Sequence, residues 1–397
     1  MMEWKEMTVG DLCDTISDTY RRKDAEVILV NTSDVLEGKI LNHQKVENKN
    51  LKGQFKKTFK KDDILYSEIR PANKRFAYVD FDSTEQYIAS TKLMVLRPRK
   101  DVVDPRFLFS LLTSNLMLEE LQHLAETRSG TFPQITFSSE LAPMPVSVPD
   151  FETQKRIVGV LDAIEGKIEN NKEINDNLAE QAHGVLYHFM DEHPYQLQPL
   201  SDIAIVIDCL HSKKPSAVED SAYQLIQLDN IRDDGFLDMS ATRYMISQAD
   251  YENWTRKCEI VEGDCVITNV GRIGAVSQAP YGTKAAMGRN MTCIRLKPEI
   301  KLQAYFITVL LSNHMRRQIQ SNTDEGTIMG ALNVKNIPKL LFPVFEPSVM
   351  TELEDILFPL RKQIEYNNLQ NQNLSQLRDT LLPKLMSGEL DVSDIDI

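Results

Sequence analysis

The feature that most constrains the fold of this 397-residue chain is a helical segment that occurs twice. The sequence IENNKEINDNL at 168–178 matches IEYNNLQNQNL at 364–374 at six of eleven positions. Both segments lie within apolar stripes of alternating four- and three-residue spacing, which is the heptad pattern of coiled-coil helices. Such a stripe needs a partner helix, and the chain supplies two helices of similar length and pattern.

Both stripes place asparagine where the pattern calls for an apolar residue: Asn171 and Asn175 in the first, Asn367 and Asn371 in the second. If the helices pack antiparallel, Asn171 faces Asn371 and Asn175 faces Asn367, so that each amide finds a partner. A shift by one heptad would break both pairs. We therefore interpret these residues as helix-register residues, which fix alignment and orientation at some cost in stability. The alternative is that they face solvent on frayed helices.

Further segments repeat at similar offsets, so the repeated unit is a whole domain. FLFSLLTSN at 107–115 resembles YFITVLLSN at 305–313, and LRP at 96–98 resembles LKP at 296–298. Each copy shows short strand-like runs, a helix, a proline-punctuated extended stretch and a long closing helix.

These patterns predict an α+β fold in which two related globular α/β domains are separated by an antiparallel two-helix coiled-coil spacer, with pseudo-twofold duplication. A helix is expected over 105–124 in the first copy and over 302–321 in the second, and Pro383 is expected to end the last long helix. The predicted boundaries are a first globular domain at 1–150, a helical spacer at 151–193, a second globular domain at 194–346, a helical spacer at 347–390 and an acidic tail at 391–397.

The charge distribution is uneven. Of the net charge of −13, residues 151–194 and 346–397 carry −11, so the two globular parts are close to neutral. Residues 39–75 hold eleven Lys and Arg against four Asp and Glu. A local basic patch of this kind can bind phosphates although the whole chain is acidic.

The composition also bears on location and chemistry. No apolar run approaches the roughly 20 residues that cross a bilayer, and the first residues lack an apolar secretory segment. The five cysteines contain no C-x-x-C spacing, which is typical of reduced thiols and not of a metal site. We expect a cytoplasmic protein that binds no metal and contacts no membrane.

Catalytic motifs are absent from the sequence. It has no phosphate-binding P-loop, no dinucleotide-binding glycine pattern and no G-x-S-x-G nucleophile. Pro149-Asp150 followed by Glu165 and Lys167 resembles a nuclease motif. However, residues two apart on a helix point about 200° apart and cannot converge on one metal ion. We predict no catalytic residue and no cofactor bound by this chain.

Cationic residues follow predicted strands in both copies. In EGDCVITNVGRIGAVSQAPYG at 262–282, Gly271 and Gly274 predict a tight turn that lifts Arg272 outward. The lysine-rich run KGQFKKTFKKDD at 52–63 interleaves lysine with phenylalanine. Such side chains suit contacts to phosphates or guanine edges, although a solvated hairpin or an amphipathic element would show the same pattern. The candidate DNA-binding residues are Lys56, Lys57, Lys60, Lys61, Arg70, Lys74, Arg75, Arg272 and Arg289.

Several motifs resemble a known family, the specificity (S) subunits of type I restriction–modification systems. LLPKLMSGEL at 381–390 resembles the family's terminal signature, and FETQKRIVGVLDAIEGKI at 151–168 resembles the entry to its central helix. EGDCVITNVGRIG and DDILYSEIRP resemble the two forms of its recognition-domain strand and turn. One departure is that FEPSVMTELEDIL lacks the glutamine that Gln154 supplies in the first copy.

The resemblance implies that each globular domain is a target recognition domain for one half of a bipartite, asymmetric site in double-stranded DNA. It also implies that the helices set the spacer and dock two modification (methyltransferase) subunits, which bind S-adenosylmethionine. Two restriction subunits would join for cleavage, so ATP and magnesium belong to partner subunits, and the chain itself is not an enzyme. The alternatives are a scaffold that bridges two identical proteins without DNA, and a fused nuclease or methyltransferase.

Overall fold

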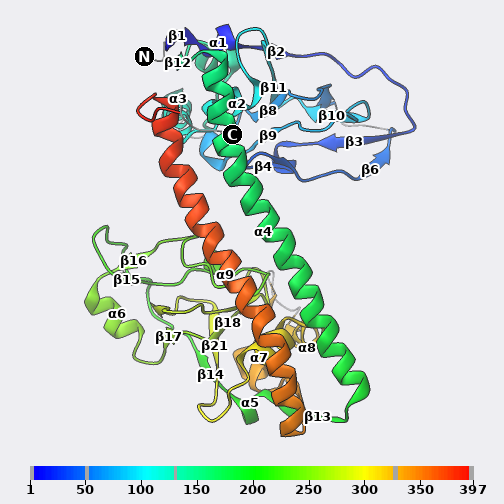
Figure 1. Cartoon of the computed structure of the whole chain (residues 1–397), viewed down its shortest axis with the longest axis vertical. Helices are drawn as coiled ribbons and strands as arrows, with labels where there is room; N and C mark the ends of the chain where they lie inside the picture. The colour runs from blue at the N-terminus through cyan, green and yellow to red at the C-terminus, as the bar shows by residue number, and fades with distance from the viewer. Residues whose placement is uncertain (1–3, 50–52, 129–131, 325–329, 393–397) are drawn as a thin grey trace. The chain divides into compact units, whose positions relative to one another are not determined.

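The computed structural model describes residues 4–49, 53–128, 132–324 and 330–392 (Figure 1). The chain packs as two compact units: unit 1 is residues 1–166 and 374–397, and unit 2 is residues 167–373. Both long helices cross from one unit to the other, so each half of a helix packs within one unit. Part of the predicted acidic tail, 393–397, lies outside the described residues.

Unit 1 is built on two four-stranded sheets. The first has the order β2-β11-β8-β9 and is antiparallel throughout, and the second has the order β6-β3-β10-β7 with β3 and β10 parallel. The strands are β1 Lys5–Thr8, β2 Cys13–Ile16, β3 Glu26–Val30, β4 Val35–Leu36, β5 Lys39–Ile40, β6 Lys45–Glu47, β7 Phe55–Lys57, β8 Ile64–Ser67, β9 Phe76–Tyr78, β10 Tyr87–Ser90, β11 Leu93–Pro98 and β12 Pro145–Val148, and the helical elements before α4 are α1 Val9–Leu12, η1 Thr32–Asp34, η2 Pro71–Asn73, α2 Pro105–Leu112, α3 Asn115–Arg128 and η3 Phe137–Leu141.

Unit 2 repeats the first of these sheets. Its largest sheet has the order β14-β21-β18-β19, again antiparallel, and the described residues of the unit also form four two-stranded ladders. Two of these, β15-β16 and β17-β20, are joined by a parallel bridge between Leu225 and Ala286. The strands are β13 Tyr195–Pro199, β14 Ala204–Asp208, β15 Tyr223–Gln224, β16 Met245–Ile246, β17 Glu259–Val261, β18 Cys265–Thr268, β19 Val276–Gln278, β20 Lys284–Ala286, β21 Met291–Leu296, β22 Thr323–Asp324, β23 Ala331–Leu332 and β24 Leu341–Phe345, and the helical elements between the long helices are α5 Leu200–Ile203, η4 Leu228–Asn230, α6 Gln248–Trp254, α7 Gln303–Leu311, α8 Asn313–Ser321 and η5 Val334–Lys339.

The two shared sheets carry the same ion pair, in which the aspartate is buried and the arginine is partly exposed. In unit 1 the Arg97 guanidinium donates two hydrogen bonds to the Asp63 carboxylate, from Nε at 2.8 Å and from Nη2 at 2.7 Å. In unit 2 the Arg295 guanidinium donates two to the Asp264 carboxylate, at 2.7 and 2.6 Å. Arg97 therefore corresponds to Arg295, whereas the LRP/LKP match had placed it opposite Lys297. A slip of two residues keeps every side chain on the same face of a strand, so the apolar pattern cannot detect it.

The helix predicted over 105–124, and its counterpart over 302–321, are each broken in two. The break lies at Ser114 in unit 1 and at Ser312 in unit 2. Each serine hydroxyl accepts a hydrogen bond from the amide three residues ahead, Met117 or Met315, and starts the second helix. Both segments pack with the shared sheet in the main core of their unit.

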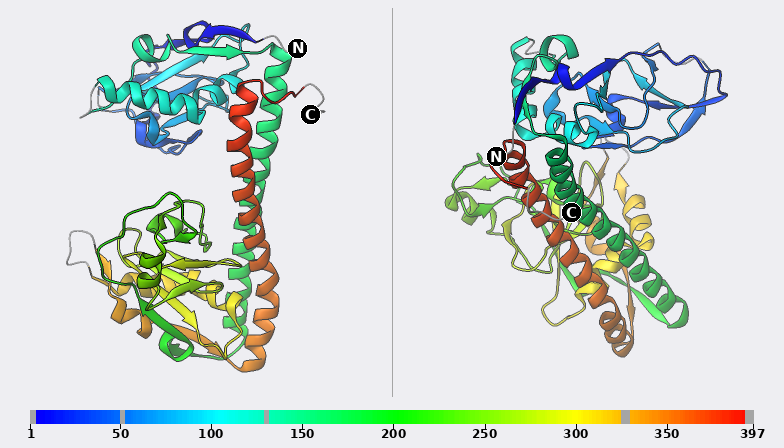
Figure 2. Two further views of the ribbon diagram at one scale, coloured as in Figure 1. Left: turned by 90° about the vertical axis from the view of Figure 1, so that its left-hand side faces the viewer. Right: turned by 45° about the horizontal axis from the view of Figure 1, so that its top comes forward.

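The long helices are α4 Phe151–Glu192 and α9 Pro347–Met386, and within each unit their halves lie side by side (Figures 1 and 2). In unit 1, Ile157 and Leu161 of α4 share the main core with Leu385 of α9. In unit 2, Leu186 of α4 and Leu357 of α9 do the same. The pairing is therefore antiparallel, as expected for this coiled coil. None of the described helices is both long and apolar enough to cross a membrane.

The end of α9 differs from the expectation that Pro383 would terminate it. The helix continues through Pro383 to Met386, and Gly388, at φ 74°, follows in the left-handed conformation. A glycine in this position is the usual stop of a helix. The Trp4 indole packs on Gly388 so closely that a side chain there would clash. The glycine therefore ends the helix, and the proline only removes one backbone hydrogen bond near it.

Candidate nucleic-acid interface and helix-register site

Four asparagines meet between α4 and α9 in unit 2. Asn171 Nδ2 donates to Asn371 Oδ1 at 2.8 Å, and Asn367 Nδ2 donates to Asn175 Oδ1 at 2.8 Å. All four side chains are buried. Because buried amides without partners are costly, this arrangement favours one alignment of the two helices over its neighbours.

Three further side chains complete this network, and the sequence pattern had not singled them out. Gln370 Oε1 accepts a second hydrogen bond from Asn171, and Gln363 Nε2 donates to Asn367 Oδ1, each at 2.8 Å. Asn368 Oδ1 accepts from Asn175 at 3.2 Å, while its own Nδ2 is buried without a partner among the described residues. The density of Asn and Gln in NNLQNQN was the available indication of an extended amide cluster.

The lysines predicted on the run at 52–63 fall into two groups. Lys56 and Lys60 are exposed, and their ammonium groups have no partner among the described residues. Lys57 is half-buried and donates to the Leu93 carbonyl at 2.8 Å, and burial lowers its pKa. Lys61 pairs with the exposed Asp82 at 2.9 Å. Lys52 lies outside the described residues.

The cations after β8 are held on a left-handed turn. Arg70 and Lys74 flank η2 with φ values of 46° and 52°. The Arg70 side chain is exposed and has no partner in the described part of the chain, whereas Lys74 lies 3.7 Å from Glu37. Arg75 instead folds back and donates to the Ser33 and Val35 carbonyls at 3.1 and 3.3 Å.

The turn after β18 does leave the Arg272 side chain exposed, at 49%, but the guanidinium is not free. Gly271 and Gly274 do adopt positive φ, of 84° and 79°. The Arg272 guanidinium nevertheless folds back onto the 228–233 segment, where it binds the Leu228 and Ile231 carbonyls and the Asp233 carboxylate. The half-exposed guanidinium therefore already has three hydrogen-bond acceptors within the chain.

Arg289 lies at the surface of unit 2 beside a hollow that Leu228, a hydrogen-bond partner of Arg272, also lines. The exposed Arg289 side chain borders this hollow of about 310 Å³, whose lining also includes Lys214, Gln227 and Asn290. Lys214 stands over the Tyr244 ring, with Nζ 3.7 Å from the ring centroid. Lys213 and Lys214 were not among the predicted DNA-binding residues, although the lysine pair in HSKKPS between two strands could have indicated them.

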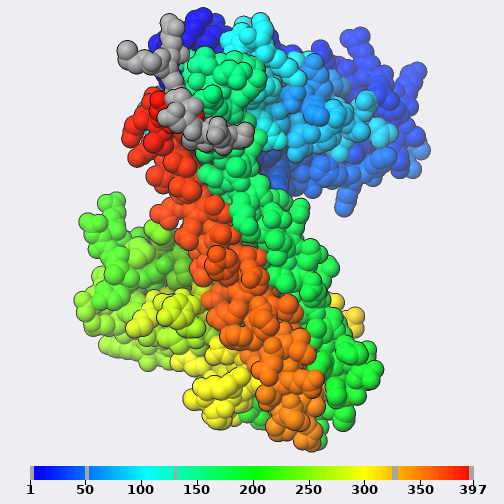
Figure 3. Space-filling model, in the orientation of Figure 1, coloured from blue at the N-terminus to red at the C-terminus, as the bar shows by residue number. Residues whose placement is uncertain are grey.

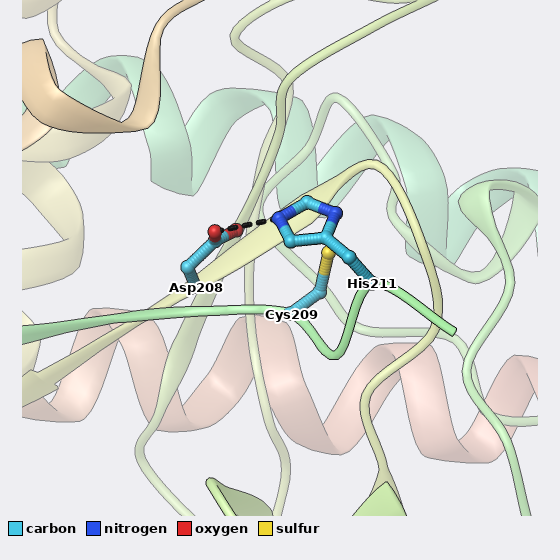
Figure 4. Close-up of side chains that lie close together, drawn as sticks. All are labelled: Asp208, Cys209 and His211. Atoms are coloured by element: carbon cyan, nitrogen blue, oxygen red, sulfur yellow. Dashed lines mark hydrogen bonds and ion pairs between the residues drawn. The ribbon is translucent and has the colours of Figure 1, made fainter.

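Two clusters in unit 2 contain metal-ligand types of side chain, although the sequence predicted no metal site. One is Asp208, Cys209 and His211 after β14 (Figure 4), and the other is Cys258, Asp264 and Cys293. In the second cluster, Arg295 occupies both carboxylate oxygens of Asp264 and lies 3.8 Å from the Cys258 sulfur. A guanidinium thus fills the position that a cation would need.

The chain is similar in sequence to proteins of one kind, the specificity subunits of type I restriction enzymes. Residues 1–180 match the family model described as "Type I restriction modification DNA specificity domain". The type I restriction enzyme HindI specificity subunit of Haemophilus influenzae is 28% identical, covering 98% of this chain and 100% of that protein. The MjaIX specificity subunit of Methanocaldococcus jannaschii is 22% identical, covering 75% of this chain and 71% of that protein.

A solved structure shares the fold. The type I restriction–modification S subunit from M. genitalium aligns with a TM-score of 0.51 at 16% identity, covering 97% of this chain and 96% of that one.

Proposed function

Because the chain belongs to the family of type I restriction–modification specificity subunits, we propose that it is the DNA-reading subunit of such a complex and recognises a bipartite, asymmetric double-stranded site. The observation that supports this most is the repetition of one sheet, with its Arg–Asp ion pair, in two units. Two copies of one scaffold suit two successive half-sites.

The half-sites are expected to differ, because the second sheets of the two units differ in length and in their insertions. Unit 1 has the sheet β6-β3-β10-β7. In unit 2 the ladders β16-β15 and β20-β17, joined by the parallel bridge Leu225–Ala286, follow the same order with shorter strands, and α6 is inserted between β16 and β17. Side chains on such elements and loops read bases, while a common scaffold positions them. Two unlike surfaces on one scaffold therefore favour an asymmetric target.

We divide the cationic side chains into those that contact DNA and those that position loops. We assign direct contact with DNA to Lys56, Lys60, Arg70 and Arg289, whose charged groups have no partner in the described part of the chain. Surface carboxylates hold Lys61 and Lys74 only weakly, so DNA phosphates can replace these partners. Lys57, Arg75 and Arg272 keep backbone carbonyls as partners and position the loops beside the DNA.

The helices are proposed to set the spacer and to dock two modification subunits. Those subunits would bind S-adenosylmethionine, two restriction subunits would bring ATP and magnesium, and this chain would contribute no catalytic residue. The outer face of α9 in unit 2 lies at the surface (Figure 3), with Phe358 and Tyr366 exposed by 50% and 60%. Exposed aromatic side chains on an acidic helix pair are typical of a surface that binds protein.

The docking proposal can be tested by charge reversal on α4. Three glutamates of α4, Glu165, Glu169 and Glu173, are candidates for this surface. Glu165 pairs with Arg378 of α9, so reversing its charge would also strain the helix pair. Glu173→Lys is the cleaner change, because Glu173 is exposed and has no partner among the described residues. Glu219→Lys, on an exposed loop of unit 2, is the matched control. Loss of modification subunits on gel filtration from the Glu173 variant alone would support docking, and a full complex from both variants would contradict it.

The central experiment expresses the chain with the modification subunits of its host and maps methylation across a genome. We expect methylation at a single motif of two unlike half-sites with a fixed gap. A mobility shift with random duplex, with and without the modification subunits, distinguishes the scaffold alternative. A complex that assembles but neither shifts DNA nor directs methylation would favour the scaffold.

A further inference from the structure

Three side chains of different chemistry converge where β14 ends. Asp208 is its last residue, Cys209 follows directly, and His211 turns back so that its Nε2 lies 2.7 Å from Asp208 Oδ2 (Figure 4). One potential ligand atom from each of the three lies within 4.8 Å of the others. A carboxylate oxygen, a thiol sulfur and an imidazole nitrogen are the three atom types that bind zinc in proteins.

The cluster has more ligand capacity than its own hydrogen bonds use. Asp208 Oδ1 is buried and has no hydrogen-bond partner among the described residues. The Cys209 side chain is 1% exposed, and its sulfur lies beside the carboxylate of Asp208 and the imidazole of His211. Burial raises the pKa of this thiol, so the proton leaves the sulfur when a metal ion binds it and not before. His211 is exposed, so an ion can reach the cluster from solvent.

We propose that Asp208, Cys209 and His211 bind one Zn²⁺ ion, with water in the fourth position. On binding, the Cys209 thiol releases its proton to solvent, the sulfur forms a bond to zinc, and the Asp208–His211 hydrogen bond is replaced by two bonds to the ion. A thiolate with an imidazole selects zinc over magnesium and calcium, which prefer oxygen ligands. The other cluster serves as the contrast, because Arg295 already neutralises its carboxylate.

The ion would fix the root of a long loop. Residues 209–222, between β14 and β15, form no helix or strand. This loop carries Lys213 and Lys214, and Arg289 and Asn290 line the same hollow as Lys214. This part of the inference rests on the proposed function: a bound ion would hold the loop cations in place beside the DNA. The metal site itself does not depend on it.

The test uses the full chain, stripped with a chelator and titrated with Co²⁺ as a spectroscopic stand-in for zinc. We expect one Co²⁺ per chain, visible d–d bands of a tetrahedral site and a thiolate-to-cobalt charge-transfer band, all removed by added Zn²⁺. Cys209→Ser should lose the charge-transfer band, and His211→Asn should weaken Co²⁺ binding by at least about tenfold. Cys258→Ser and His188→Asn, in the same unit, are matched controls and should bind normally.

The possible results test separately whether the metal site exists and whether a bound ion holds the loop at 209–222 in place. A wild-type chain without a thiolate band, or a Cys209→Ser chain that keeps it while circular dichroism shows intact folding, overturns the metal site. If the site binds metal but removing zinc changes DNA affinity of the assembled complex less than twofold, the loop-fixing role is wrong. If the complex binds no DNA with or without zinc, the proposed function fails, and the cobalt titration still decides the metal site.

Discussion

The side-chain amide of Asn171 on α4 donates to the side-chain oxygen of Asn371 on α9 at 2.8 Å, in a contact that leaves the two residues 1% and 8% exposed. These residues are 200 positions apart in the sequence, and both interrupt apolar stripes. An amide that fills a core position stabilises the fold only while its partner is opposite, so the pair distinguishes the correct alignment from the adjacent ones.

Asn171→Leu should lower the free energy of unfolding by about 1–3 kcal/mol, because Asn371 and Gln370 each lose a buried partner. Asn177→Leu, on the exposed face of the same helix, is the control and should change it by less than about 0.5 kcal/mol. Chemical denaturation measures both. The double variant Asn171→Leu/Asn371→Leu should recover much of the loss, since two apolar residues then face each other. A double variant that loses the sum of both single effects would contradict the pairing.

The repeated ion pair gives a second prediction. Asp63→Ala and Asp264→Ala should each lower the free energy of unfolding by about 1–3 kcal/mol, because each leaves a partly exposed guanidinium, Arg97 or Arg295, without its carboxylate partner. Asp80→Ala, which removes an exposed carboxylate, is the control. Thermal unfolding of the full chain should show the cost in both variants. If either variant unfolds like wild type, the two pairs are not equivalent supports of the sheet.

Arg289 and Arg272 are predicted to behave differently when changed to alanine. Arg289→Ala should weaken DNA binding by the assembled complex. If Arg289 contacts a base, the loss should be about 1–3 kcal/mol and confined to one base pair of the site. If it contacts a phosphate, binding should weaken at every sequence and its dependence on salt concentration should become smaller. Arg272→Ala should mainly lower the stability of unit 2, since the Leu228 and Ile231 carbonyls lose their donor. Binding titrations at several salt concentrations, with thermal unfolding alongside, separate the two. If Arg272→Ala changed the base preference of the complex and left the stability of unit 2 unchanged, Arg272 would contact a base directly.

Shortening the helices tests whether they measure the gap between half-sites. Removing 166–172 from α4 and 370–376 from α9 takes one heptad and one register asparagine from each helix. The Asn175–Asn367 contact and the Glu165–Arg378 ion pair remain aligned across the junction. Each helix loses about 10 Å, so the spacer should shrink by up to about three base pairs while the half-site bases stay the same.

Genome-wide methylation mapping with the shortened chain measures the new spacer. A variant that lacks 166–172 of α4 but keeps all of α9 is the control. It should assemble poorly, because the apolar stripes and the asparagines of the two helices would no longer lie opposite each other. An unchanged spacer with altered half-site bases would show that the helices do not set the distance.

The sequence by itself determined the elements whose physical signals are local or periodic. Heptad spacing identified α4 and α9, and the need of each buried amide for a partner indicated which asparagines meet. Short apolar runs indicated that each copy contains strands before its helix. The motifs LLPKLMSGEL and FETQKRIVGVLDAIEGKI carried the resemblance to the specificity-subunit family, and that resemblance implied paired recognition domains.

Only the tertiary structure decided what depends on contacts between distant segments. A strand pattern repeats every two residues, so it could not show that Arg97 corresponds to Arg295 and not to Lys297. Whether a cation is free or held depends on carbonyls elsewhere in the chain, and for this reason Arg272 could not be distinguished from Arg289. The Asp208, Cys209 and His211 cluster likewise needed a turn that brings the imidazole back to the carboxylate, because residue spacing alone does not fix where side chains converge.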